Sequence, residues 1–412
     1  MPKLLWVSPL SVHDSSNPSA AQMRNMLLSL KARGIEIIGL SALNFLNESG
    51  TSMFTDLDDK LKGNETSFNL EDNGIKFIYI RTKSRKLGDM ISQEQRNFYA
   101  KFCAIINAFR PDVVMGSGTD MLSMVCFDEA RRRGLPTTYT LLDGTPARFN
   151  FPNIDLVVTD SAATSNLYAT KHRINSVVTG SFTEVTGPLA FGGKVEHDPS
   201  NKKFITMVEP TVDKGLGIFL RLSQNVPAQA RNLKFAVRES YAGQFTEQVA
   251  LLKDKANPNK APFTKAALSK IFVLGPEVTD AELFESTKVL MVPSLSFESI
   301  NNISREAITY GVPVLATNQT GLAESIGEAG VLVEIPEYCL NNHYMAPAAE
   351  DLANFYKGLQ IILTEDFTNR TVDVAKRYNI NYSANRLAAT LKPLFDKCAG
   401  NNPQLLRNGS LI

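Results

Sequence analysis

Short apolar runs alternate with helix-length segments from one end of this chain to the other. This alternation is typical of parallel sheets whose faces are covered by helices. The chain has 412 residues, whereas a single domain commonly holds about 100 to 200. We therefore predict an α/β protein built from two domains, each with its own core.

Each half of the chain carries its own series of predicted strands. The first helix is expected from Pro18 to about Arg33, because Asn17 can cap it, Pro18 suits its first position and Gly34 follows its end. In the first half we expect strands at 4–8, 36–40, 76–80, 112–116, 137–142, 156–159 and 176–179. In the second half we expect strands at 203–208, 234–237, 271–274, 289–292, 314–316 and 331–334.

A linker is expected between the halves, because residues 187–201 are rich in glycine, polar and charged residues. We predict one domain at residues 1–190 and a second at 191–380, with helices near 348–363, 366–377 and 383–397. The tail at 401–412 is expected to be disordered. In open parallel sheets ligands bind at the carboxyl ends of the strands, so a cleft between two such domains is the expected place for a site.

Composition excludes several classes of function. The formal net charge of +1 gives no reason to expect nucleic acid as a partner. The four cysteines are too scattered for a metal site or disulfide framework, and no apolar run approaches the roughly 18 residues that span a bilayer. We expect a cytoplasmic protein, with basic segments at 81–86 and 131–133 as candidates for a peripheral contact with the inner membrane face or for a charged acceptor.

The stretch "FESINNISREAITYGVPVLA", from Phe297 to Ala316, sets Glu298 and Glu306 around the start of a predicted helix. The preceding segment is a predicted strand, so this loop lies where free backbone N–H groups and the helix dipole favour a phosphate. Carboxylates accept hydrogen bonds from vicinal hydroxyl groups. Phosphate and diol together describe a nucleotide sugar. The Glu-x7-Glu spacing alone also occurs by chance, so its context decides.

That context resembles the nucleotide-sugar motif of retaining glycosyltransferases with the GT-B fold, family 4 (glycosyl transferases group 1). The matching residues are Pro293, Ser294, Glu298, Ser299, Asn302, Glu306, Ala307, Gly311, Pro313, Val314, Ala316, Gly321 and Glu324. The departures are Ile300, Asn301 and Thr320, where the family usually has Phe, Gly and Gly. Because asparagine tolerates a left-handed backbone, we expect Asn301 to preserve the turn.

The resemblance implies two Rossmann-like α/β domains that face each other across a cleft, with a helix at 381–400 returning to the N-terminal domain. It also implies roles in donor binding. Glu298 would hold hydroxyl groups of the donor sugar and Glu306 the nucleotide ribose. Backbone amides near Asn301 and Asn302 would face the sugar and distal phosphate, and the neighbouring Ile300 belongs to the same donor pocket.

Further donor residues come from two other segments of the second half. Lys214 precedes Gly215 and resembles the family lysine that binds the diphosphate, although taken alone it is a surface lysine before a helix. Val208 stands where many relatives carry an arginine, and Arg238 is predicted to supply that charge. Val278 is expected in the base pocket. The segment itself does not separate uracil from guanine, and we expect a UDP sugar ahead of a GDP sugar.

Acceptor-side residues are sought in the first half. His13 and Asp14 follow the first strand, Ser117 follows the strand "PDVVMG", and Asp143 follows "TYTLL", close to Leu142 where relatives have a histidine. A loop histidine is more often solvated than catalytic. We nevertheless group His13 with Glu298 and Lys214 as the catalytic candidates.

With the resemblance, these residues predict sugar transfer from a nucleoside diphosphate sugar to a glycan, lipid-linked saccharide or protein, with retention and without metal or cofactor. The acidic run at 56–59 lies outside the cleft segments. A non-catalytic GT-B partner subunit is the main alternative, favoured by Val208, Asn301 and Leu142, and a sugar-nucleotide epimerase is another. No G-x-G-x-x-G follows the first strand of either half, which disfavours a nicotinamide oxidoreductase.

Overall fold

The computed structural model describes residues 1–15, 17–46, 65–142, 154–195, 201–255, 257 and 259–400, with only the backbone at 398–400. The chain divides into two compact units. The first unit combines Met1–Glu184 with Ile380–Ile412, and the second is Val185–Asn379. The acidic run at 56–59 and the predicted disordered tail lie outside the described residues.

The first unit is built on one sheet with strand order β3-β4-β2-β1-β5-β6-β7-β8. Its strands are parallel except for the antiparallel pair β3 and β4. The strands are β1 (Lys3–Val7), β2 (Glu36–Ala42), β3 (Ser67–Asp72), β4 (Ile75–Ile80), β5 (Val113–Gly116), β6 (Thr137–Leu141), β7 (Leu156–Thr159) and β8 (Val177–Val178). The helices are α1 (Pro18–Lys31), α3 (Ser92–Phe109), α4 (Met121–Arg132), α5 (Ala162–His172) and α15 (Ile380–Gly400).

Strand β1 shows why its sequence is a continuous apolar run. Leu4 and Trp6 pack into one hydrophobic core, and Leu5 and Val7 pack into another on the opposite face of the sheet. A strand covered by helices on both faces needs apolar side chains at every position. The loops after β1 and β5 therefore begin at the carboxyl edge of a sheet whose strands are held in place by packing on both faces.

The second unit repeats the plan with the parallel order β12-β10-β9-β13-β14-β15 and a small pair, β11 and β16. Its strands are β9 (Phe204–Val208), β10 (Lys234–Arg238), β11 (Lys253–Asp254), β12 (Phe272–Leu274), β13 (Thr287–Val292), β14 (Val314–Thr317), β15 (Gly330–Val333) and β16 (Met345–Ala346). Its helices are α6 (Leu216–Gln224), α7 (Gln244–Leu251), α8 (Lys265–Leu268), α9 (Asp280–Ser286), α10 (Asn302–Thr309), α11 (Leu322–Ile326), α12 (Glu337–Asn341), α13 (Ala353–Thr364) and α14 (Thr368–Ala375).

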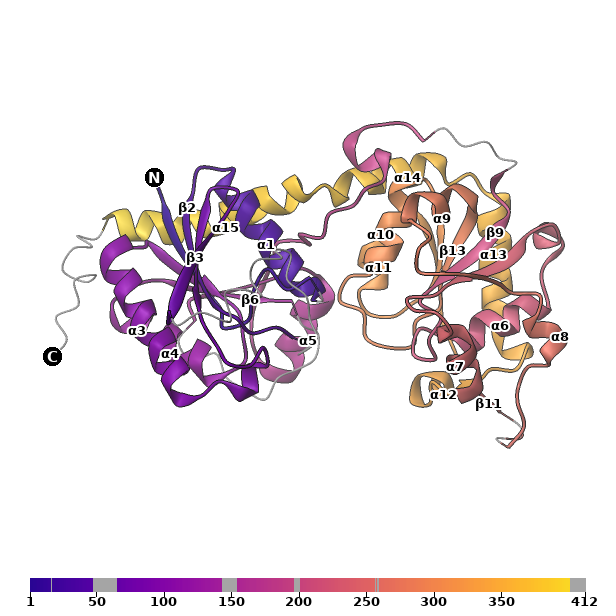
Figure 1. Ribbon diagram of the computed structural model, residues 1–412. Coiled ribbons are helices and arrows are strands. Elements are labelled where there is room, and N and C mark those ends of the chain that lie inside the picture. The colour runs from indigo at the N-terminus through magenta and orange to yellow at the C-terminus, as the bar shows by residue number, and fades with distance from the viewer. Residues whose placement is uncertain are drawn as a thin grey trace. The chain divides into compact units, whose positions relative to one another are not determined.

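The C-terminal helix α15 belongs to the first unit, as expected from the resemblance. Figure 1 shows α15, in yellow, beside α1. The Arg33 guanidinium, just after α1, donates hydrogen bonds to the side chains of Asn381 and Asn385. Leu387 and Leu391 of α15 are fully buried in the same core as the apolar face of α1. The end of the chain thus completes the core at its beginning.

Most predicted strands are confirmed to within one or two residues. Strand β3 was missed, because its sequence "SFNLED" is half polar and it lies at the edge of the sheet, where one side faces solvent. Strands β11 and β16 have two residues each and were also missed. Within the described residues, none of the helices is long and apolar enough to span a bilayer.

Candidate functional site

The loop between β13 and α10 carries Glu298, and its carboxylate is enclosed and paired. Lys214 Nζ donates to Glu298 Oε1 at 2.6 Å, and Ser294 Oγ donates to the same oxygen at 2.8 Å. The Glu298 side chain is 8% exposed, against 28% for Lys214. Within the described part of the chain both hydrogen bonds fall on Oε1, which leaves Oε2 available for a ligand.

Lys214 reaches this loop because Gly215 allows two backbones to meet. Gly215 has φ +83°, and a Cβ at this position would lie 1.9 Å from the Pro293 carbonyl oxygen. Only glycine adopts this conformation without strain and leaves room for the contact. The β9–α6 turn is therefore held against the end of β13, and the lysine sits next to the glutamate from another strand.

The pKa of Lys214 lies above its ordinary value. Burial acts to lower this pKa, but the charge of Glu298 and its hydrogen bond outweigh burial, with smaller contributions from Glu209 and Asp213. The ammonium group therefore stays charged at neutral pH. It has three N–H donors, so it can hold Glu298 and a phosphate oxygen at once.

Helix α10 begins with Asn301 as its cap. The Asn301 side-chain oxygen accepts hydrogen bonds from the N–H and hydroxyl of Ser304, and its own N–H donates to Ser325 Oγ at 2.9 Å. Its φ is −94°, so the predicted left-handed turn at Asn301 is wrong. The positive φ of this loop region falls instead at Thr320, with φ +30°.

Thr320 and Gly321 fix the main chain of Glu298. The Thr320 hydroxyl accepts from the Glu298 N–H and donates to the Glu298 carbonyl, each at 2.8 Å. A Cβ on Gly321 would lie 1.8 Å from the Ser299 carbonyl oxygen, so glycine is required here. The threonine that replaces a family glycine therefore adds a hydrogen-bonded clamp on the glutamate backbone.

The start of α10 offers free donors for an anion. In the residues that the structure describes, the backbone N–H groups of Asn302 and Ile303 have no hydrogen-bond acceptor, whereas Asn301 uses its N–H internally. Ile300 is partly exposed in the preceding turn. Helix N-termini favour negative charge through such unpaired amides and through the dipole. Of the two amides predicted to face the donor, that of Asn302 is available to a ligand, whereas that of Asn301 is not.

Glu306 lies on α10 and is almost fully enclosed, with 6% exposure. Thr186 donates to its Oε1 through the backbone N–H, at 2.9 Å, and through its hydroxyl group. Burial raises the pKa of Glu306, and the two hydrogen bonds from Thr186 partly offset that increase. The carboxylate is thus held in place by two hydrogen bonds from one residue.

Arg238 forms an ion pair within the second unit. Its Nη1 donates to Asp280 Oδ1 at 2.5 Å and to the Val278 carbonyl at 3.2 Å. The arginine joins the end of β10 to the start of α9, with Val278 beside it. Arg238 is thus paired with Asp280 as Lys214 is paired with Glu298, so both cations already have one carboxylate partner.

In the first unit, His13 lies in a closed hydrogen-bond network and not in a solvated loop. Tyr79 donates to His13 Nδ1 at 2.5 Å when the imidazole is neutral, and His13 Nε2 donates to Asp72 at 3.1 Å. Arg24 binds both oxygens of Asp72, at 2.6 and 2.8 Å. The His13 side chain has no exposed surface. This burial does not support the predicted catalytic role, because a reacting group must reach its substrate.

The other acceptor-side candidates are Asp14, Ser117 and Asp143. Asp14 is also buried, and its carboxylate accepts a hydrogen bond from the Leu46 N–H. Ser117 follows β5, is half-buried, and donates to Met23 Sδ at 3.0 Å. Asp143 lies outside the described residues.

Four contact residues of this site were missed at the level of sequence: Thr186, Asp280, Ser294 as a ligand of Glu298, and Thr320 as its clamp. In the sequence, Thr320 stood out only because it replaces a glycine of the family motif. Thr186 gave no signal, since it lies 120 residues from Glu306. Among the described residues, no three His, Cys, Asp or Glu side chains gather as a metal site would require.

Solved structures with the same architecture identify the class of fold. They include a glycosyltransferase from Rickettsia africae ESF-5, at 17% identity and TM-score 0.63, covering 97% of this chain and 99% of that chain. HepE of Anabaena, solved with UDP and glucose, has 14% identity and TM-score 0.59 over 95% and 100% of the two chains. An α,α-trehalose 6-phosphate synthase from Burkholderia multivorans has 11% identity and TM-score 0.58 over 97% and 98%. The chain has the GT-B fold.

The sequence comparison points the same way for part of the chain. Residues 211–340 match the family model of glycosyl transferases group 1. This segment is less than half of the chain and contains Lys214, Glu298 and Glu306. No curated protein matches the chain.

Proposed function

We propose that this protein is a glycosyltransferase that moves a sugar from a nucleoside diphosphate sugar to an acceptor. The observation that carries the proposal is the Lys214–Glu298 pair at 2.6 Å, beside the free amides that open α10. A cation, a carboxylate and a helix N-terminus in one place suit a diphosphate joined to a polyhydroxyl group. All three elements lie in the segment that matches glycosyl transferases group 1.

In this proposal the enzyme acts mainly by stabilising charge. As the bond from sugar to phosphate breaks, negative charge develops on the leaving diphosphate. Lys214 places its positively charged ammonium group there, and the Asn302 and Ile303 backbone amides add two neutral hydrogen-bond donors. Glu298 binds a sugar hydroxyl through Oε2 while its Oε1 keeps Lys214 in position.

Glu306 is assigned to the ribose. Thr186 occupies only Oε1 of this carboxylate, so Oε2 is left for a ribose hydroxyl. An enclosed carboxylate with a raised pKa gains from a neutral diol, which satisfies it without adding charge. Its position on α10 ties recognition of the nucleotide to the helix that faces the phosphate.

Finer parts of the proposal come from the resemblance. The donor is a UDP sugar, which agrees with the UDP and glucose in the structure of HepE. The transferred group is a hexose, and the anomeric configuration is retained. Lys214 and the amides supply the positive charge that a metal supplies elsewhere. The acceptor is a glycan, lipid-linked saccharide or protein, and the enzyme acts in the cytoplasm, with peripheral contact to the inner membrane face.

Thermal unfolding with a panel of UDP and GDP sugars tests the proposal. A ligand that binds only the folded state raises the midpoint as its concentration passes the dissociation constant. We expect a rise with one UDP sugar, lost in Lys214→Ala and Glu306→Ala when each variant is compared with its own ligand-free midpoint. Lys376→Ala is the matched control, because this exposed lysine also pairs with a carboxylate, that of Asp373, and not with Glu298 or Glu306.

Turnover of the donor completes the test. Sugar attached to an acceptor supports a transferase, whereas rearranged sugar without transfer indicates an epimerase. A folded sample that shifts with no nucleotide sugar contradicts the proposal and favours the non-catalytic partner.

A further inference from the structure

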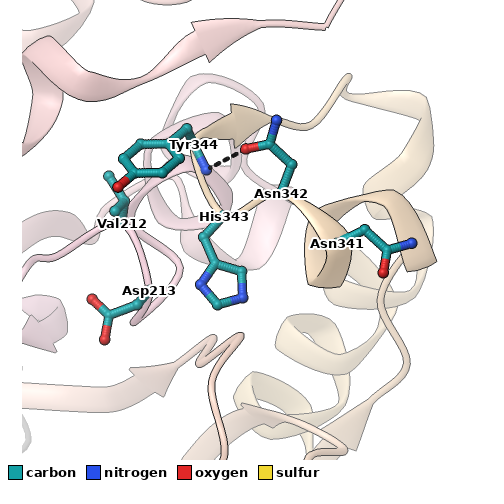
Figure 2. Close-up of a pocket in the computed structure, with 6 residues that line it drawn as sticks. All are labelled: Val212, Asp213, Asn341, Asn342, His343 and Tyr344. Carbon is teal, nitrogen blue, oxygen red and sulfur yellow. Dashed lines mark hydrogen bonds between the residues drawn. The ribbon is translucent and has the colours of Figure 1, made fainter.

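A cavity of about 410 Å³ with a mixed polar and apolar lining lies in the second unit, and neither Glu298 nor Glu306 lines it. Figure 2 shows the side chains that line it. They are Val212, Asp213, Asn341, Asn342, His343 and Tyr344. Small-molecule sites commonly measure about 300 to 1,000 Å³, so the cavity suits a small ligand.

Two segments far apart in the chain build the cavity, and both are fixed by backbone hydrogen bonds. The Asp213 carbonyl accepts from the Leu295 N–H at 2.8 Å, which ties the turn before Lys214 to the end of β13. The Tyr344 carbonyl accepts from the Lys253 N–H at 2.8 Å, next to the β11–β16 pair. The cavity walls therefore have a defined shape before any ligand arrives.

The second segment lies outside the region shared with the family model. That match ends at residue 340, whereas four of the six lining residues are at 341–344. The cavity thus combines a turn inside the matched segment with a connection that follows it in the chain. Nothing in the match assigns a ligand to it.

Several polar groups in the lining are available. Among the described residues, the side chains of Asp213, Asn341 and His343 have no hydrogen-bond partner, and Asn342 uses only its oxygen, which accepts from the Tyr344 N–H at 3.1 Å. The Tyr344 side chain adds an aromatic surface and is 47% exposed. A carboxylate, two amides and an imidazole around an aromatic ring offer both acceptors and donors at short range.

We propose that this cavity binds a neutral saccharide unit. Sugar hydroxyls both donate and accept, so they can pair with Asp213 and with the asparagine amides, while the apolar face of a sugar ring covers Tyr344. The Asp213 carboxylate disfavours a phosphate. A metal ion is disfavoured because no cluster of three acidic, histidine or cysteine ligands occurs among the residues that the structure describes.

The cavity is joined to the donor site through the chain itself. Asp213 directly precedes Lys214, and both belong to the turn held against the end of β13. We assign the bound sugar as one unit of the acceptor, and this assignment rests on the proposed function. The prediction that the cavity binds a neutral sugar does not depend on the proposed function, because it follows from the residues that line the cavity.

Saturation-transfer NMR on the full chain, with saturating UDP present, tests the inference. The probes are glucose, galactose, mannose, N-acetylglucosamine and their common disaccharides, with inorganic phosphate as a separate arm. We expect one of these sugars to bind. Tyr344→Ala and Asp213→Asn should each weaken its affinity about tenfold. Tyr382→Ala is the control, since Tyr382 is exposed on α15 in the other unit and contacts Arg386.

The outcomes separate the two proposals. UDP affinity should stay within about twofold in Tyr344→Ala and Tyr382→Ala, because among the described residues neither side chain contacts Glu298, Glu306 or Lys214. Asp213→Asn removes a negative charge beside Lys214, so UDP affinity is compared only in the two tyrosine variants. Equal sugar binding by wild type and both cavity variants, absence of binding by every neutral sugar, or displacement of the sugar by phosphate would overturn the saccharide site. Failure of UDP itself to bind would overturn the proposed function while leaving the sugar measurement valid.

Discussion

Lys214 and Glu298 form an ion pair whose acidic partner is far more enclosed than its basic partner. Removing only the lysine leaves a buried carboxylate with one neutral donor, Ser294. We predict that Lys214→Met lowers the free energy of unfolding by about 1–3 kcal/mol. The double variant Lys214→Met/Glu298→Leu should be more stable than the sum of the two single changes predicts, because it leaves no unpaired charge.

Urea unfolding of the two single variants and the double variant measures this coupling. If the two single effects add within about 0.5 kcal/mol, the pair does not interact as described. The same variants bear on the proposed chemistry. Loss of one preorganised donor to a developing anion commonly costs about 10² to 10³ in rate, so Lys214→Met should lose donor turnover even where it remains folded.

Glu306, which we propose binds the ribose, is expected to destabilise the free protein at neutral pH. Burial holds its pKa above the ordinary 4.5, so the folded state binds more protons than the unfolded state just above pH 4.5. Stability from this group is therefore present at low pH and lost as pH rises through the raised pKa. We predict that Glu306→Gln raises the free energy of unfolding at pH 7 by about 0.5–1 kcal/mol while it weakens UDP binding.

The check on Glu306 is the difference in unfolding midpoint between variant and wild type at two pH values. The difference should be larger at pH 7 than at pH 4.5. A variant that is less stable than wild type by the same amount at both values would show that the hydrogen bonds from Thr186 outweigh the cost of burial.

His13 predicts the opposite dependence on pH in the first unit. Burial lowers its pKa below the ordinary 6.5, although the hydrogen bond and charge of Asp72 act to raise it and the charge of Arg24 acts to lower it. Tyr79 and the edge contact with Phe77 complete its surroundings. Below about pH 6.5 the imidazole of His13 is protonated more fully in the unfolded chain than in the folded protein, so the free energy of unfolding falls as pH falls.

Denaturant unfolding between pH 5.5 and 7.5 checks this sign. The slope against pH should be smaller in His13→Gln than in wild type, because the group that titrates is gone. The carboxylate of Asp72 does not titrate in this pH range and so does not contribute to the slope. Its pKa is lowered because the hydrogen bonds from His13 and Arg24 outweigh burial, so its contribution is lost only below the ordinary 3.8. An unchanged slope in His13→Gln would refute the assignment.

At the scale of elements, the contact between the β9–α6 turn and the end of β13 positions Lys214. We predict that Gly215→Ala weakens UDP binding and lowers stability by more than the roughly 1–2 kcal/mol expected for left-handed backbone alone. Gly243→Ala is the matched control: φ at Gly243 is +88°, against +83° at Gly215, but a Cβ there meets nothing within 4 Å. Equal losses in the two variants, measured by urea unfolding, would show that the close approach to Pro293 is unimportant.

The elements that the sequence predicted well are those with strong local signals. Buried parallel strands are continuous apolar runs, and helix α1 has its cap at Asn17 and its proline at the first position. Strand β3 lacked such a signal because Asn69 and Glu71 break its apolar pattern at the edge of the sheet. Local patterns therefore predicted the sheets better than their edges.

Contacts within the candidate site could be predicted only in part. The motif placed Glu298 and Glu306 near a helix start, which the structure confirms. It could not show that Asn301 is extended and that the positive φ falls at Thr320. Both conformations depend on hydrogen bonds between the loop around Glu298 and a segment about twenty residues further along the chain. It also could not show that Arg238 is neutralised by Asp280, because both residues are charged and either could have faced solvent.

At the scale of the whole molecule, the first unit depends on residues from both ends of the chain. Leu387 of α15 is fully buried in the core that also contains Leu27 and Leu30 of α1. Leu359 of α13 is equally buried in a core of the second unit. These two leucines therefore allow a matched comparison of the two units.

We predict that Leu387→Ala and Leu359→Ala each cost about 2–5 kcal/mol, the usual range for a leucine deleted from a core. Amide hydrogen exchange should place each loss in a different unit. Leu387→Ala should speed exchange in β1, β2 and α1 and leave β9 and β13 protected, whereas Leu359→Ala should do the reverse. Because the proposed donor residues Lys214, Glu298 and Glu306 belong to the second unit, only Leu359→Ala should also weaken UDP binding at a fixed temperature. Equal exchange changes across both units, in either variant, would mean that the two cores unfold as one.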